Sequence, residues 1–427
     1  MGKTALAQHI YHRQELLGHF DVKVWICVSL KFNVDKLVEG IEKQIPEVDN
    51  ENRGTAAELI EQRLKTKRFL LVLDDMWECS NTDEWKRLLL PLKSSQKKGN
   101  TILVTTRRPA VAGTVVTKTD YSIELGGLAY EEFKELFLAF VFDDEQSRMD
   151  HPELVETGDK IMEKLKGSPL AAKTVCTLLR KHLDFNHWNR VLESQEWKEQ
   201  KDKNDIMPAL KLSYDYLPFY LQPCFSYCAL FPQDYRFGRE ELIHLWIGLD
   251  VLHLCGENNK RIEDIGLSHL EELVDHGFLK NEEKDGKTYY VLHDLLHELA
   301  LKVSSRECLS IYSYNVGSIQ APPSVRHLSI NIDDTSVKDK QTFDSCTRDL
   351  KKLDKRLKVE NLHTLMLFGE HHGSFVKTFA NLFQEAKFIR VLFLSGASYN
   401  MEDLLPNFLK LIHLRYLRIE SDYFFSS

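Results

Sequence analysis

Two short elements constrain this chain more than any others: a Gly2-Lys3-Thr4 tripeptide that opens a helical run, and an apolar run that ends in Asp74 and Asp75. A glycine turn before a helix offers backbone N–H groups to phosphate, a lysine meets phosphate oxygens, and a hydroxyl binds magnesium. The tripeptide matches the last part of that arrangement. Because it also arises by chance in unrelated chains, the acidic element downstream gives it weight.

The acidic pair predicts a metal site. A carboxylate at the end of an apolar strand holds Mg²⁺ through water, and a second acid orients the attacking water. We therefore predict that Asp74 serves the metal and Asp75 is the catalytic acid, although an isolated aspartate pair is also typical of a polar turn or a helix cap. Arg107 ends the next apolar strand. We expect it at the same sheet edge, in contact with the γ-phosphate, with a plain surface arginine as the alternative.

Strand-like and helix-like runs alternate over the first third of the chain. Residues 22–30, 68–77 and 101–106 are β-rich, with helical composition between them. This alternation predicts a parallel sheet covered by helices. From about 126 to 310 the pattern is helical, with a Gly-Ser-Pro break at 167–169. The sequence thus predicts a multidomain α/β protein.

The last hundred residues repeat one apolar-x-x-Leu-x-apolar frame, in segments that begin 37, 27 and 25 residues apart. This frame is typical of a leucine-rich repeat, with leucines in a solenoid core and intervening residues on a concave surface. Four unrelated strands of an α/β domain are the alternative. The frame positions are Val325/Leu328/Ile330, Leu362/Leu365/Leu367, Ile389/Leu392/Leu394 and Leu414/Leu417/Ile419.

Composition excludes several classes of protein. A chain of 427 residues predicts several domains, and a net charge of -8 argues against nucleic acid or an anionic membrane as the main partner. No apolar run approaches the roughly 20 residues of a transmembrane helix. The eight cysteines, without a signal peptide, favour free thiols in the cytoplasm. Cys224 and Cys228 lack two further zinc ligands, so we expect buried thiols.

Seven motifs in order carry a family resemblance. The chain resembles the plant nucleotide-binding leucine-rich-repeat disease-resistance proteins of the NB-ARC family. Trp77 and the sixth motif resemble the subclass with an N-terminal coiled coil. The motifs are "GKT", "VKVWICVS", "FLLVLDDMW", "TILVTTR", "GSPLAAK", "CFSYCALFP" and "LHDLLHELA".

The resemblance implies a slow ATPase that works as an ADP/ATP switch with Mg²⁺. Pro169 matches a proline near the nucleotide base, although Ser168 replaces the usual leucine. His293 and Asp294 fall in a Met-His-Asp motif whose histidine approaches the β-phosphate of ADP, with Leu292 in place of methionine. Gly2, Lys3, Thr4, Asp74, Asp75 and Arg107 match the phosphate, magnesium, catalytic and sensor positions.

The resemblance also implies domains and partners. We expect a nucleotide-binding domain at 1–125, a helical domain at 126–200, a winged helix at 201–310 and leucine-rich repeats at 320–427. The winged helix would serve the switch, so no direct nucleic acid binding is expected. The implied partners are a pathogen effector or a guarded host protein, bound through the repeats, and other copies of the chain on activation.

Family members carry a strand and further P-loop glycines ahead of the position that matches Gly2. Since the sequence begins inside this motif, we expect an incomplete P-loop domain and weak nucleotide binding. A non-catalytic interaction or decoy fragment is therefore the alternative function. A metabolic P-loop kinase is a third possibility, disfavoured because no substrate-phosphate clamp is evident.

Overall fold

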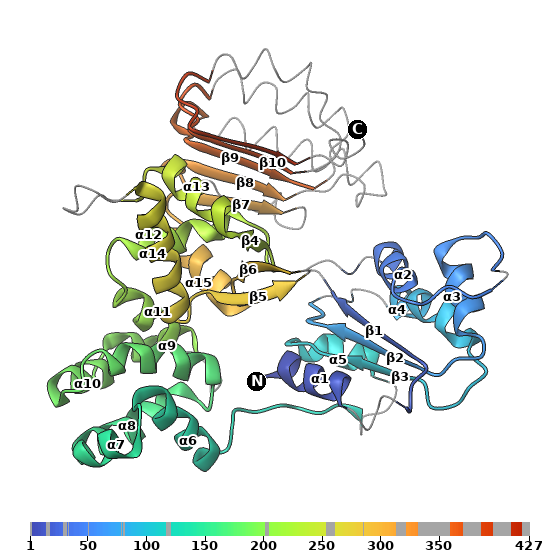
Figure 1. Cartoon of the computed structure of the whole chain (residues 1–427), viewed down its shortest axis with the longest axis horizontal. Coiled ribbons are helices and arrows are strands. Elements are labelled where there is room, and N and C mark those ends of the chain that lie inside the picture. Colours follow the sequence, from blue (N-terminus) through green and yellow to red (C-terminus); the bar gives the residue numbers. More distant parts are fainter. Residues whose placement is uncertain are drawn as a thin grey trace. The chain divides into compact units, whose positions relative to one another are not determined.

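The fold comes from a computed structural model of the whole chain (Figure 1). The chain forms two compact units, Met1–Leu128 and Ala129–Ser427. The structure describes residues 2–13, 18–28, 32, 34–49, 51–77, 79, 82–116, 121–200, 205–252, 261–284, 286–312, 322–331, 359–369, 386–395 and 411–420.

The first unit is a parallel sheet with helices on its faces. Its described strands lie in the order β1-β2-β3, and both pairs are parallel, which confirms the predicted sheet. Its elements are α1 (Lys3–His12), β1 (Val22–Cys27), α2 (Val34–Glu42), α3 (Ala56–Leu64), β2 (Phe69–Asp74), α4 (Thr82–Leu89), the 3₁₀ turn η2 (Pro91–Ser94), β3 (Thr101–Val104) and α5 (Pro109–Val115).

Strand β2 forms the middle of this sheet, and all six of its residues are buried. Leu71 and Leu73 point into a core shared with α2, α3, α4 and α5, whereas Leu70 and Val72 pack against Ala7 of α1 on the other face. The sequence of a strand that is buried on both faces is a continuous apolar run. Its carboxyl end, with Asp74, therefore emerges from a rigid core.

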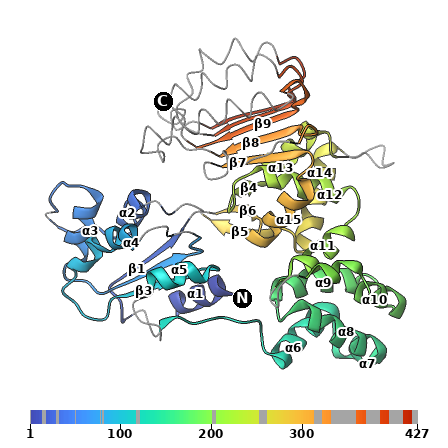
Figure 2. The same cartoon turned by 180° about the vertical axis from the view of Figure 1, so that it is seen from behind.

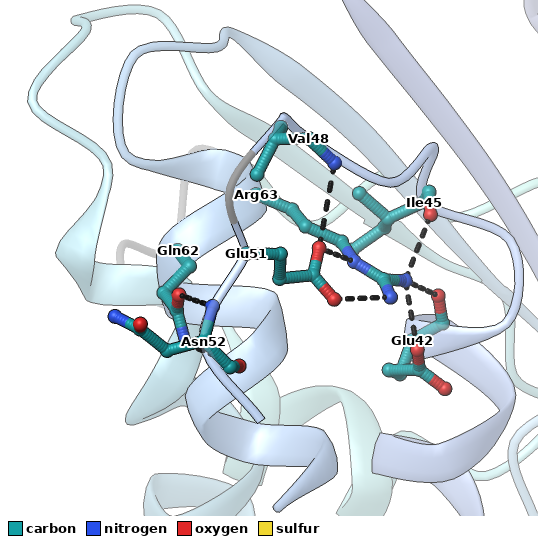
Figure 3. A network of polar contacts seen from close by, with 7 residues as sticks. All are labelled: Glu42, Ile45, Val48, Glu51, Asn52, Gln62 and Arg63. Carbon is teal, nitrogen blue, oxygen red and sulfur yellow. Dashed lines mark hydrogen bonds and ion pairs between the residues drawn. The ribbon is translucent and has the colours of Figure 1, made fainter. Parts of the chain in front are cut away.

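A buried arginine fixes the loop between α2 and α3 (Figure 3). The Arg63 side chain is 5% exposed, and its Nε lies 2.7 Å from Glu51 Oε2. Its Nη1 lies 2.7 Å from Glu42 Oε1 and donates to the Ile45 carbonyl at 3.0 Å. It also donates to the Glu42 carbonyl at 2.9 Å, so one guanidinium ties two carboxylates and two backbone oxygens together, as its planar fork allows.

The second unit begins with helices and ends with parallel strands (Figure 1). Its elements are α6 (Tyr130–Val141), α7 (Glu145–Asp150), α8 (Pro152–Leu165), α9 (Pro169–Arg180), α10 (Phe185–Leu192), η4 (Gln195–Glu199), α11 (Met207–Asp215), α12 (Leu221–Ser226), η5 (Tyr227–Leu230), β4 (Arg236–Gly238), α13 (Arg239–Leu249), α14 (Ile262–Asp275), β5 (Lys280–Lys284), β6 (Lys287–Val291), α15 (Asp294–Ser304), β7 (Cys308–Tyr312), β8 (His327–Asn331), η7 (Val359–Asn361), β9 (Thr364–Phe368), β10 (Val391–Ser395) and β11 (Tyr416–Glu420).

The helical part of this unit packs around aromatic side chains. Trp188 of α10 is fully buried, meets Phe137 of α6 edge to face, and donates its Nε1–H to the Leu179 carbonyl at 3.3 Å. Gly158 of α8 lies where a Cβ would stand 3.0 Å from the Phe137 ring. Further along the chain, α11 to α15 accompany a small antiparallel sheet in the order β4-β6-β5.

Five parallel strands follow one another in sequence order, β7 to β11, and β7, β8 and β9 are visible side by side in Figures 1 and 2. Leu328, Leu365 and Leu392 occupy matching register positions. The repeat-frame side chains other than Leu417 meet in one core, which confirms their predicted inward orientation. Leu417 on the outer strand β11 is 44% exposed. Strand β7 extends this sheet ahead of the first predicted frame.

The second face of this parallel sheet packs against the region around α13. Phe368 and Phe393 lie 5.6 Å, centroid to centroid, from the Phe231 ring. The Ser310 hydroxyl donates to the Ala229 carbonyl at 2.8 Å. The sequence predicts a concave binding surface here, but in the described strands these positions are largely buried against the chain's own aromatic residues.

The described cysteines fit the expectation from composition. Among the described residues, Cys27, Cys79, Cys176, Cys224, Cys228 and Cys308 are all free thiols. Burial raises the pKa of Cys228 to about 12. No helix in the described part of the chain combines the length and the hydropathy that crossing a membrane requires.

Candidate functional site

The start of α1 and the carboxyl ends of β2 and β3 carry six of the eight predicted site residues. Gly2 precedes the helix in the left-handed region at φ 69°. Its carbonyl accepts the first helical hydrogen bond, from the Leu6 N–H at 2.9 Å. Glycine takes this backbone conformation without steric cost, so Lys3 and Thr4 start the helix directly after the turn.

Asp74 lies at the centre of this group. Its carboxylate is 4% exposed, and Oδ1 accepts hydrogen bonds from the Thr4 hydroxyl at 3.1 Å and the Thr105 hydroxyl at 2.5 Å. Thr4 and Asp74, predicted from the sequence as magnesium ligands, are thus in direct contact. Two hydroxyl donors satisfy a carboxylate that would otherwise be costly to bury.

Asp75 adopts a different geometry from its neighbour. Its backbone is in the left-handed region at φ 52°, and its N–H donates to Thr105 Oγ1 at 2.8 Å. Its carboxylate accepts from Trp77 Nε1 at 2.7 Å, and its Oδ1 lies 3.6 Å from Arg107 Nε. A non-glycine residue in this region is uncommon and is typical of sites that aim a side chain.

Trp77 connects the charges at this edge of the sheet. The Arg107 guanidinium carbon lies 5.5 Å from the centroid of the Trp77 ring, and that of Arg108 lies 5.6 Å away. These are cation–π distances. From the sequence, Trp77 indicates only a subclass, and no site role is predicted for Thr105 or Arg108. The hydroxyl pair after β3 is the signal that could have identified Thr105.

The ammonium group of Lys3 is partly buried among these charges. Burial, followed by the charge of Arg107, lowers the pKa of Lys3 from its ordinary value, while Asp75 and Asp74 raise it. Two cations therefore stand near two carboxylates. An anion with several oxygens would relieve the repulsion between the two cations, and a divalent cation would offset the two carboxylates.

The donor set suits magnesium and phosphate. Thr4 and Asp74 offer hydroxyl and carboxylate oxygens, the hard ligands that Mg²⁺ prefers. Within the described ranges, no group of three or more histidine, cysteine or acidic side chains could hold a metal ion by itself.

Pro169 and His293, the other two predicted site residues, belong to the second unit. Pro169 is the first residue of α9, capped by the Ser168 hydroxyl, which accepts from the Ala171 N–H at 3.3 Å. His293 is exposed at the start of α15, where Nδ1 accepts from the Leu295 N–H at 3.2 Å. Both residues thus lie at helix N-termini.

Comparison with known proteins places two domains on this chain. Residues 1–147 match the NB-ARC domain, and residues 230–300 match the disease resistance protein winged helix domain. The first match contains the lysine, aspartate and arginine cluster, and the second contains α13, α14 and the β4-β6-β5 sheet.

Several curated plant proteins are similar over most of the chain. Putative disease resistance protein RGA4 from Solanum bulbocastanum is 36% identical over 74% of this chain and 32% of its own length. Disease resistance protein RGA2 from the same species is 37% identical over 71% of this chain and 31% of its own length. Disease resistance RPP13-like protein 4 from Arabidopsis thaliana is 26% identical over 99% of this chain and 47% of its own length. The chain spans about a third of the length of the first two relatives.

Among solved structures, a signal transduction ATPase with numerous domains and a tetratricopeptide repeat sensor, from Pyrococcus horikoshii, matches with a TM-score of 0.43 and 16% identity. The match covers 90% of this chain and 49% of that one. The domain matches and the plant relatives identify the family without it. The chain belongs to the plant disease resistance proteins in which an NB-ARC domain is followed by a winged helix domain.

Proposed function

We propose that this chain is an ADP/ATP-dependent switch of plant immunity, with the nucleotide phosphates and Mg²⁺ held at the start of α1. The contact between Thr4 and Asp74 is the observation that carries this proposal. It joins the hydroxyl of the phosphate-binding helix to the acid at the end of β2, which is the pairing that a magnesium-bound nucleotide requires.

Each residue of the cluster has a proposed role. The Gly2 turn and the Lys3 ammonium bind phosphate oxygens, and Thr4 and Asp74 hold Mg²⁺. Arg107 contacts the terminal phosphate. Bound ATP would supply the negative charge that Lys3 and Arg107 neutralise. Asp75 orients water for a slow hydrolysis, and its bonds to Trp77 and Arg107 keep its carboxylate in place.

The second unit is proposed to read and transmit the nucleotide state. Pro169 contacts the base and His293 the β-phosphate of ADP, so the helical domain at 126–200 and the winged helix at 201–310 respond to exchange. The strands at 320–427 are proposed to be leucine-rich repeats that bind an effector or a guarded host protein and restrain the switch. Self-association in the cytoplasm follows activation. A ligand drives such a change only through its different affinity for the two states.

The test is nucleotide binding to the intact chain. Titration with a fluorescent ADP analogue, with and without Mg²⁺, should give saturable binding that Lys3→Ala lowers by at least about tenfold, because a cation on the phosphate is lost. Lys86→Ala is the matched control. This exposed lysine pairs only locally, with Asp83 at 3.0 Å, and its removal should leave binding unchanged.

The magnesium assignment has its own variant. Thr4→Val keeps the side-chain shape but removes the hydroxyl, so the Mg²⁺ dependence of binding should weaken. If wild type and Lys3→Ala both leave the nucleotide unbound, the switch proposal is wrong for this chain. The alternative, an interaction fragment without a nucleotide role, then stands.

A further inference from the structure

The four repeated strand segments share a position, occupied by arginine or histidine, that the leucine frame does not explain. Arg326, His363, Arg390 and Arg415 each stand directly before a parallel strand, at the same frame position. The backbone N–H groups of the last three donate at 2.7 Å to the carbonyls of Arg326, His363 and Arg390 respectively. Neighbouring strands lie about 4.8 Å apart, so these side chains form one column, called here the basic column.

The two faces of the sheet are already occupied. One face carries the frame leucines in their own core. On the other, Thr364, Val391 and Phe393 are fully buried, and a Cβ at Gly248 of α13 would lie 2.8 Å from the Tyr416 Cβ. Within the described strands, the amino-terminal edge that carries the basic column is thus a better candidate surface than either face.

The column already binds a carboxylate of its own chain. Asp250, the C-cap residue that follows α13, has an exposed side chain, and its Oδ1 lies 3.1 Å from Arg415 Nη1. Its Oδ2 lies 3.8 Å from Arg390 Nη1. The edge of the sheet therefore presents arginines at a spacing and orientation that suit an acidic side chain.

The other end of the column borders an open depression. It has a volume of about 310 Å³ and is lined by Glu307, Pro323, Ser324, Arg326, Asn361 and His363. Burial, together with Arg390 and Arg326, lowers the pKa of His363. A carboxylate, an imidazole, a hydroxyl and an amide beside one arginine suit a mixture of charged and neutral hydrogen-bonding groups.

Large apolar side chains accompany the column. Phe388 is 50% exposed and stacks on the His413 ring at 5.4 Å, and Ile412 is 80% exposed. Each stands two or three residues before a column arginine. An inorganic or sugar phosphate has no group that would cover such side chains, whereas a polypeptide can bury them while its acidic residues meet the arginines.

We propose that the basic column and the apolar residues beside it, Phe388 and Ile412, form a docking surface for an extended polypeptide segment rich in acidic and apolar side chains. This inference rests on the proposed recognition role of the repeats. It places the contact at the amino-terminal ends of the strands and not on a face of the sheet. Acidic side chains would pair with Arg326, Arg390 and Arg415, and apolar ones would cover the Phe388 ring.

The test uses the full chain and a fluorescein-labelled peptide of five Glu-Leu repeats, followed by anisotropy. Binding should weaken as salt rises, and the double variant Arg326→Ala/Arg390→Ala should bind at least about tenfold more weakly. Phe388→Ser should also weaken binding. Arg239→Ala, which changes an exposed arginine at the start of α13, is the matched control and should bind as wild type.

Two comparisons separate the outcomes. A Glu-Gly peptide of equal charge should bind more weakly, and tripolyphosphate should compete poorly. No binding by wild type, binding retained by the double variant, or efficient displacement by tripolyphosphate would each overturn the proposal. Lys3→Ala should leave peptide binding intact, so failure of the nucleotide switch and failure of this docking surface are distinguished.

Discussion

At the scale of single residues, Trp77 determines how the charges at the end of β2 are arranged. Its indole N–H donates to Asp75, and its ring lies beneath the guanidinium groups of Arg107 and Arg108. Thr105 positions Asp74 in a similar way. Its hydroxyl donates to the Asp74 carboxylate, and the same oxygen accepts a hydrogen bond from the Asp75 N–H. An uncharged pair of side chains thus holds two carboxylates in different orientations.

Two substitutions of Trp77 distinguish the contribution of its hydrogen bond from the contribution of its aromatic ring. Trp77→Phe removes the donor to Asp75 but keeps an aromatic face for Arg107, so the free energy of unfolding should fall by about 1 kcal/mol. Trp77→Leu should cost more, since the cation–π contacts are lost as well. Urea unfolding followed by circular dichroism measures both variants. Equal stability of Trp77→Phe and wild type would show that the indole N–H does not hold Asp75.

Thr105→Val tests the buried acid. The variant has nearly the same shape but leaves Asp74 without one hydroxyl donor and the Asp75 N–H without its acceptor, which should cost about 1–3 kcal/mol of unfolding free energy. The control is Thr114→Val on α5, whose hydroxyl only bonds back to the Ala110 carbonyl of its own helix. That change should be nearly neutral. A loss of similar size in both variants would contradict the role given to Thr105.

At the scale of elements, the contact between α13 and the parallel strands depends on a residue without a side chain. Gly248 faces β10 and β11, where an added Cβ would lie 2.8 Å from Tyr416 Cβ and 3.1 Å from Val391 Cγ2. The first of these atoms is bonded to the backbone and cannot turn away. Glycine at this position therefore sets how closely the helix approaches the strands.

Two glycine-to-alanine changes compare this contact with an open position. Gly248→Ala should destabilise the chain by about 1–3 kcal/mol, because overpacking outweighs the gain in helix propensity. Gly113→Ala on α5 meets nothing within 4 Å and should stabilise it by about 0.5–1 kcal/mol. Thermal unfolding of both proteins gives the comparison. A stabilising Gly248→Ala would mean that the helix does not pack this closely on the strands.

At the scale of the whole molecule, a buried histidine joins η5 to the parallel sheet of the second unit. His327 Nε2 lies 3.2 Å from the Tyr227 hydroxyl, and Nδ1 lies 2.9 Å from Thr364 Oγ1. Burial, and then the nearby His363, Arg326 and Arg390, lower the pKa of His327 to about 3. The neutral imidazole is the form that this contact accommodates.

Acid should therefore weaken this contact. An unfolded histidine titrates near pH 6.5, so the unfolded chain takes up a proton at His327 before the folded chain does. Stability from this site is complete above pH 6.5 and is lost as pH falls toward 3, by about 2 kcal/mol between pH 7 and pH 5. His327→Asn should lower the stability difference between those two pH values in urea unfolding, whereas His244→Asn, at an exposed position, should not. An unchanged difference in His327→Asn would contradict the burial of a neutral histidine.

The sequence predicted the elements whose apolar pattern is strong. The apolar run at 68–77 predicted β2 and the two acids at its end, because a strand buried on both faces has a continuous apolar sequence. The repeat frames predicted β8 to β11, because buried leucines recur in them at a fixed spacing. It did not predict the hairpin of β5 and β6, since β5 consists of charged, largely exposed residues whose strand form comes from pairing with β6. Strand β7 was missed for a similar reason, because the frame that defines the later strands is absent from it.

Of the proposed site, the sequence by itself determined which side chains are its candidates: a lysine and a hydroxyl after a glycine, two acids after one strand, and an arginine after the next. Only the tertiary structure decided how they are held, with Thr4 and Thr105 on Asp74 and Trp77 on Asp75. It also decided that the second face of the described repeat strands is covered by the aromatic residues near α13. The local hydrophobic pattern predicts which residues are buried but not which residues cover them. The covering residues come from a distant part of the chain, so they do not affect the periodicity of the segment that they bury.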